Sequence, residues 1–177
     1  MKHALRLVAA LALFAAPAAA QDPMMAGDHT DPVTSITKMQ DQFMGWIVAA
    51  SEQVPASAYD FQPTPEIRTF SQLFGHVANS NFMFCAGIKD EKDPNTTDFE
   101  KATRAEVMAG LKAAKSYCDD AAKFGAAHHH DARTFFGTKG DVTWLTAFNA
   151  THNAEHYGNI VTYMRLKGMT PPSSQGS

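Results

Sequence analysis

Four long segments in which apolar residues recur every three or four positions dominate this sequence. No run of alternating β-branched residues separates them. The segments cover about residues 31–54, 69–88, 103–124 and 143–167. Segments with this period form amphipathic helices, which must bury their apolar faces against one another. The sequence therefore predicts an all-α domain with the architecture of a four-helix bundle.

The ends of these segments carry residues that start and stop helices. The second segment begins with a capping box formed by Thr69 and Gln72, and the third with one formed by Thr103 and Glu106. Gly168 follows the last periodic residues of the fourth segment and provides a natural C-terminal stop. These signals support the helix boundaries independently of the apolar pattern.

Two cysteines, Cys85 and Cys118, select among bundle topologies. They lie near the C-terminal ends of the second and third predicted helices. In antiparallel neighbours those ends would be about 25–30 Å apart, at ~1.5 Å of rise per residue, which no disulfide can bridge. In parallel helices the sulfurs lie at the same end, and residues 89–102 are long enough to cross the bundle. An even number of cysteines in an exported chain favours one disulfide, with two buried free thiols as the alternative, and that disulfide requires the parallel arrangement. The expected topology is up-down-down-up, with a long crossover between helices 2 and 3.

The first twenty residues are typical of a secretory signal peptide. Lys2 and Arg6 precede an apolar run that is too short to span a bilayer, and the small residues Ala18-Ala19-Ala20 follow it. We expect residues 1–20 to be removed, 21–30 to form a flexible leader, 31–172 to form the bundle and 173–177 to form a loose tail. The protein would be periplasmic or secreted, without a stable membrane anchor, in a compartment where disulfides persist.

The charge balance argues against one class of partner. Removal of the signal peptide would leave 13 of the 15 Lys and Arg residues against 18 Asp and Glu, a net charge of −5. No basic stripe appears in the sequence, so nucleic acid is not an expected partner.

Three histidines offer the clearest chemistry. His152 and His156 are four residues apart on the fourth predicted helix, so their imidazoles share one face. That face begins with apolar residues, and buried imidazoles need partners. A divalent metal would satisfy both, and His76 on the second helix is the candidate third ligand. We expect Zn²⁺ or Ni²⁺ as the bound metal, and Fe, Co or Mn are also compatible with imidazole ligands. Three protein ligands leave one coordination position open.

These histidines also allow other interpretations. His76 alone would be an ordinary half-buried side chain, and His152 and His156 alone could be helix-surface residues. The stretch His152-Asn153-Ala154-Glu155-His156 matches the inverted zinc-peptidase motif, but that motif needs an acidic ligand downstream, and Glu155 is the last acidic residue of the chain. We therefore reject the peptidase. Glu155 is either a solvated carboxylate or a partner or base beside the metal. His128–His130 are expected in a solvated loop.

The order of these motifs resembles the DinB-like (YfiT-type) family of metal-binding four-helix bundles over about residues 33–174. The matching stretches are Tyr59-Asp60-Phe61 with Pro63, Leu73-Phe74-Gly75-His76-Val77-Ala78, His152-Asn153-Ala154-Glu155-His156-Tyr157-Gly158-Asn159, and Tyr163-Met164-Arg165-Leu166. The resemblance implies parallel central helices and one divalent metal ion on His76, His152 and His156. Asn79, Ser80, Asn153 and Tyr157 are candidates for lining the pocket.

The family resemblance leaves three functions to compare. Characterised relatives include thiol-dependent transferases and isomerases, which implies a metal-dependent hydrolase or transferase that activates water or a thiol on an unknown small molecule. The expected export from the cytosol and the cysteine pair both argue against a thiol-dependent enzyme. The alternatives are a non-enzymatic metal-binding or stress-related bundle and a helical interaction module, such as a homodimer formed through an apolar helix face.

Overall fold

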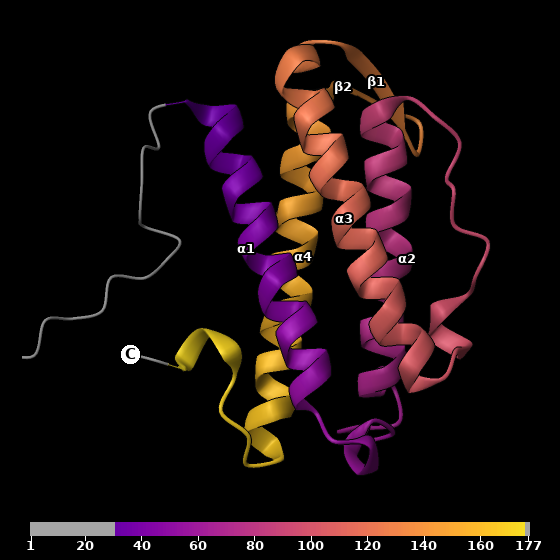
Figure 1. Ribbon diagram of the computed structural model, residues 1–177, viewed down its shortest axis with the longest axis vertical. Helices are drawn as coiled ribbons and strands as arrows, with labels where there is room; N and C mark the ends of the chain where they lie inside the picture. Colours follow the sequence, from indigo (N-terminus) through magenta and orange to yellow (C-terminus); the bar gives the residue numbers. More distant parts are fainter. Residues whose placement is uncertain (1–30, 176–177) are drawn as a thin grey trace, which may run out of the picture.

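Four long helices lie side by side in the computed structural model, which describes residues 31–175 (Figure 1). They are α1 (Pro32–Gln53), α2 (Phe70–Lys89), α3 (Arg104–His128) and α4 (Val142–Leu166). The predicted helical bundle is therefore confirmed. The expected signal peptide at residues 1–20 and leader at 21–30 lie outside the described residues. Within residues 31–175, no helix is long and apolar enough to cross a bilayer.

The helix ends form as their capping residues predict. The side chains of Thr69 and Thr103 each accept a hydrogen bond from a backbone N–H in the first turn, and Gln72 and Glu106 return the reciprocal bond. Both predicted capping boxes are thus present at the starts of α2 and α3. The third helix continues past its predicted end at residue 124 and ends at His128.

The two central helices, α2 and α3, run parallel, and α1 and α4 run in the opposite direction (Figure 1). Residues 90–103 carry the chain back along the outside of the bundle and contain the short 3₁₀ helix η3 (Phe99–Lys101). Cys85 on α2 and Cys118 on α3 form a disulfide with a Cα–Cα distance of 5.3 Å. The up-down-down-up topology predicted from these cysteines is confirmed, because their helix ends lie at the same pole.

A short β-hairpin between α3 and α4 was not predicted. Strands β1 (Ala132–Phe135) and β2 (Thr138–Asp141) pair antiparallel across a two-residue turn at Phe136-Gly137. Both turn residues have positive φ angles, 46° and 78°, as a tight hairpin turn requires. The strands are four residues long and lack the alternating β-branched pattern by which strands are recognised, so the sequence suggested a loop.

The apolar core forms two clusters with a polar layer between them. The larger cluster contains Phe70, Phe74 and Ile160, and the smaller one contains the disulfide and Phe135. Asn81 of α2 and Asn153 of α4 lie in the polar layer with no exposed surface, and their side-chain amides hydrogen-bond to each other at 2.8 and 3.0 Å. Three histidines from the same two helices line the edge of this layer.

The last described residues, 172–175, are hydrogen-bonded to the bundle. Residues Pro172–Ser174 form a 3₁₀ helix, and the backbone N–H of Ser173 donates to the hydroxyl of Tyr157. The side chain of Gln175 donates to that of Gln53 on α1. Side chains of α1 and α4 thus accept hydrogen bonds from residues 173 and 175.

Candidate metal centre

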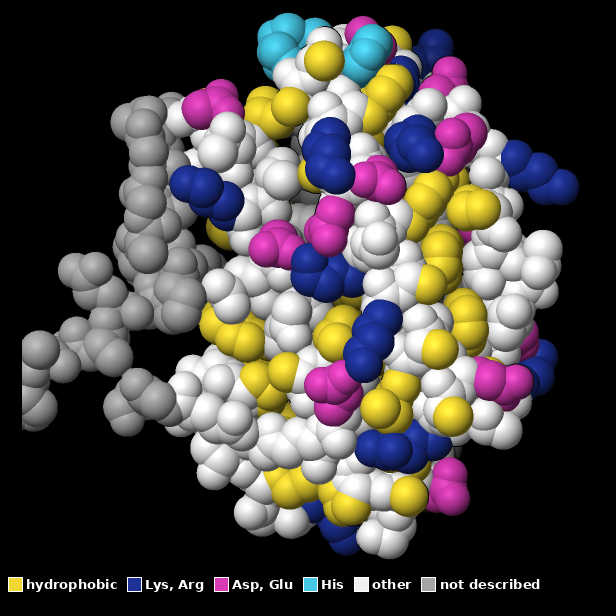
Figure 2. All heavy atoms as spheres, viewed as in Figure 1, with side chains coloured by type: hydrophobic (Ala, Val, Ile, Leu, Met, Phe, Trp, Pro, Cys, Tyr) yellow, Lys and Arg dark blue, Asp and Glu magenta, His cyan; other side chains and the backbone are white. Residues whose placement is uncertain are grey.

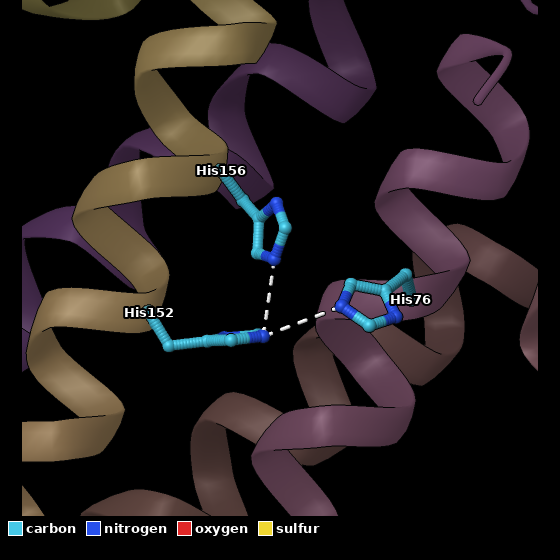
Figure 3. A group of neighbouring side chains, drawn as sticks. All are labelled: His76, His152 and His156. Atoms are coloured by element: carbon cyan, nitrogen blue, oxygen red, sulfur yellow. Dashed lines mark hydrogen bonds between the residues drawn. The ribbon is translucent and has the colours of Figure 1, made fainter. Parts of the chain in front are cut away.

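Three imidazole rings from two helices meet at one point in the bundle (Figure 3). His76 comes from α2, and His152 and His156 come from successive turns of α4. The Nε2 atom of His152 lies 3.3 Å from Nε2 of His76 and 3.1 Å from Nε2 of His156. One potential ligand atom from each ring lies within 4.8 Å of the others. The structure thus brings together the three residues that the sequence nominated as metal ligands.

Burial keeps these rings neutral at physiological pH. It lowers the pKa of His152 to about 3, with a further contribution from the neighbouring His156 and His76. Burial and then His76 lower the pKa of His156 to about 4, and burial also lowers the pKa of His76. Neutral imidazoles keep a lone pair for a cation, so the electrostatics suit metal binding. No fourth His, Cys, Asp or Glu joins the cluster among residues 31–175.

A carboxylate that the sequence did not single out holds the first of these rings. Oε1 of Glu100, in η3, lies 3.2 Å from Nδ1 of His76, while Oε2 accepts a hydrogen bond of 3.1 Å from Nε of Arg68. A carboxylate on the second ring nitrogen of a metal-binding histidine fixes the tautomer and orients the ring. Glu100 therefore directs Nε2 of His76 toward the other two rings.

A glycine beside His76 allows η3 to come so close. A Cβ atom on Gly75 would lie 2.3 Å from the carbonyl oxygen of Phe99 and 2.7 Å from the backbone nitrogen of Glu100. The ring of Phe99 in turn lies over Gly110 of α3, where a Cβ would be 2.5 Å away. The one sequence signal for this docking is an aromatic residue, Phe99, within an otherwise polar linker.

A cavity of about 610 Å³ opens beside the histidines, at the wall formed by His156. Its lining residues come from the connection between α1 and α2, the start of α2, η3 and α4. The polar residues on its wall include Arg68, Glu100 and Glu155. Glu155, for which the sequence left open a solvated carboxylate or a partner or base beside the metal, is exposed to solvent and lies on the same wall as the candidate ligand His156. A volume of this size is typical of small-molecule sites.

The four residues nominated for the pocket lie elsewhere. Asn79 and Ser80 line a separate hollow under the crossover, where Asn79 accepts a hydrogen bond from the backbone of Phe99. Asn153 is buried against Asn81, and Tyr157 is buried, with its ring stacked on that of Trp46. The sequence placed all four near the histidines along their helices, but helix rotation turns them away from the cavity wall.

The histidine run at residues 128–130 lies at the far end of the bundle from η3. His128 ends α3, where its ring stacks on Phe124 and its Nδ1 lies 2.9 Å from a carboxylate oxygen of Asp131. Figure 2 shows histidine side chains gathered at this pole, and Lys and Arg side chains interspersed with Asp and Glu over the face of α1 and α3. This run therefore does not contribute to the three-histidine cluster.

Comparisons with known proteins point to one family. A family model described as the DinB superfamily matches residues 47–160. The fold is similar to the crystal structure of a DinB-like protein from Bacillus cereus ATCC 10987, with a TM-score of 0.68 and 13% sequence identity. That match covers 78% of this chain and 95% of the other. At this identity the likeness concerns the fold alone. No curated protein matches the chain.

Proposed function

The chain belongs to the DinB superfamily, and we propose that it is an exported protein that binds one divalent metal ion through His76, His152 and His156. The observation that carries this proposal is the convergence of three neutral imidazoles, one of which, that of His156, lines a cavity of small-molecule size. Zn²⁺ and Ni²⁺ are the first candidates, and Fe, Co and Mn are compatible with the same donors.

We further propose that the protein is a metal-dependent hydrolase or transferase. A divalent ion on three imidazoles keeps a coordination position for a small molecule and lowers the pKa of a water or thiol held there. Glu155, which has no ion-pair partner among the described residues, lies on the cavity wall as a proton acceptor. Glu100 keeps the ring of His76 in place, and the ring of Phe84, 5.3 Å from that of His152, covers the site on its apolar side.

Elemental analysis of the protein produced through its own export route tests metal binding. The parent protein should carry His128→Ala, His129→Ala and His130→Ala, so that the exposed run contributes no metal. We expect about one metal ion per chain in this parent. The same protein with His152→Ala and His156→Ala should contain none. Equal metal content in the two samples, or no metal after loading with zinc and nickel, would overturn the proposed site.

A cobalt-loaded sample separates an enzyme from a storage or structural protein. Azide added to the cobalt protein should change its visible absorption spectrum, because an open coordination position admits an added ligand. Glu155→Gln should leave cobalt binding and the azide response intact and should lower any hydrolase or transferase activity. An unchanged spectrum at saturating azide would favour the non-enzymatic alternative.

Export is proposed on the N-terminal pattern and on the disulfide. The Cys85–Cys118 bond fits an oxidising compartment, where such bonds persist. The mass of the protein recovered from the periplasm or medium should correspond to cleavage after Ala20. A full-length mass in the cytosolic fraction would contradict this assignment.

A further inference from the structure

We propose that Arg68 is the residue that selects the substrate of this site, and that it binds a single carboxylate group on a small molecule whose other end reaches the metal position. The proposal rests on the proposed function and adds the chemical class of the ligand. It follows from the hydrogen bonds of Arg68, from the position of Glu100, and from the charges around the cavity.

Arg68 presents unused donors to the cavity. Its guanidinium donates through Nε to Glu100, and neither Nη1 nor Nη2 has a hydrogen-bond partner among the described residues. The side chain is 43% exposed, so a molecule in the cavity can reach it. The planar fork of an arginine matches the two oxygens of a carboxylate, to which it donates two parallel hydrogen bonds.

Glu100 holds this fork at a fixed place relative to the candidate ligands. One of its oxygens accepts from Arg68 and the other lies against His76, so only a carboxylate and an imidazole ring separate the guanidinium from the metal position. The backbone of Arg68 is fixed as well, because its carbonyl oxygen accepts a hydrogen bond from the hydroxyl of Tyr163 on α4.

The charges around the cavity disfavour a doubly charged anion relative to a singly charged one. Three carboxylates, those of Glu66, Glu100 and Glu155, share the wall with Arg68. A doubly charged group such as a phosphate monoester would be repelled more strongly by these carboxylates than a single carboxylate is. The remaining polar groups of the wall, Gln62 and Asn159 among them, are uncharged. The site therefore fits a small monocarboxylic compound with a metal-binding atom a few bonds away.

A pair of matched hydroxamates tests this assignment on the cobalt-loaded protein. Succinic monohydroxamate carries a carboxylate, and butyrohydroxamate has a methyl group at the same position. Titration of each into the protein, followed by the visible absorption of cobalt, gives two dissociation constants. We expect the carboxylate probe to bind at least about tenfold more tightly. Arg68→Gln should abolish that preference while the dissociation constant of butyrohydroxamate changes less than about twofold.

Two further variants make the result specific. Arg68→Lys keeps the positive charge without the fork and should retain only part of the preference. Arg165→Gln removes an exposed arginine of α4 that lies outside the cavity, and should leave both constants unchanged. Equal affinity of the two probes for the wild-type protein, or a preference that survives in Arg68→Gln, would overturn the assignment. Failure of the wild-type protein to bind cobalt would instead refute the metal site, and the assignment with it.

Discussion

Replacing Gly75 by alanine should weaken metal binding without touching any ligand. The added Cβ would lie 2.3 Å from the carbonyl oxygen of Phe99. The oxygen is a backbone atom and the position of a Cβ is fixed by its own backbone, so no side-chain rotation can relieve the clash. To restore an ordinary contact, η3 must move by about 1 Å. The contact between Glu100 and His76 is already 3.2 Å long, and a shift of this size removes it as a hydrogen bond.

Two effects set the size of the change in stability. Overpacking of a close contact typically costs about 1–3 kcal/mol, while alanine is favoured over glycine inside a helix by about 1 kcal/mol. We therefore expect Gly75→Ala to lower the free energy of unfolding by about 0–2 kcal/mol, so the protein still folds. Loss of the carboxylate behind a metal-binding histidine typically lowers metal affinity about 10- to 100-fold, and we expect a loss in that range.

Chelator competition for zinc and urea unfolding measure these two quantities. Gly158→Ala on α4 is the matched control, because nothing lies within 4 Å of the added Cβ. The control should keep its zinc affinity and gain about 0.5–1 kcal/mol of stability. Because both changes act through one contact, Gly75→Ala combined with Glu100→Gln should bind zinc no more weakly than Glu100→Gln alone. Wild-type zinc affinity in Gly75→Ala, or full additivity in the double variant, would refute this reasoning.

Three other predictions concern stability. Replacing Cys85 and Cys118 together by serine should lower the free energy of unfolding by about 3–4 kcal/mol, the value for a loop of 33 residues, as seen by urea unfolding. Asn81→Ala should cost about 1–3 kcal/mol by the same assay, because it leaves two buried amides without their partner. In the metal-free protein, His152 and His156 have pKa values below the 6.5 of an unfolded chain, so the unfolded state takes up protons first and stability falls as pH drops from 7 to 5. The loss should be at most about 2 kcal/mol per histidine, and thermal unfolding that is flat over this range would contradict it.

The helices and the candidate ligands could be predicted because their signals are local. Capping boxes, apolar periodicity and the spacing of His152 and His156 depend on neighbours within one or two turns. The cysteine pair also allowed the helix topology to be predicted, because a disulfide restricts which helix ends can lie at the same pole. The hairpin lacked such a signal: its four-residue strands are defined by their pairing and by the contact of Phe135 with Phe84.

The surroundings of the site were decided by contacts between distant parts of the chain. Glu100 lies 24 positions from His76, and its contact depends on the crossover docking against Gly75. Arg68 faces the cavity because Tyr163, 95 positions away, fixes its backbone.

The sequence by itself determined four helices, their order in the bundle and three histidines suited to one ion, because periodicity, caps and covalent reach are properties of short stretches of chain. Only the tertiary structure decided which carboxylate supports His76 and which residues form the cavity. Those choices depend on how each helix is rotated about its axis and on how closely η3 can approach α2, and packing of the whole domain sets both.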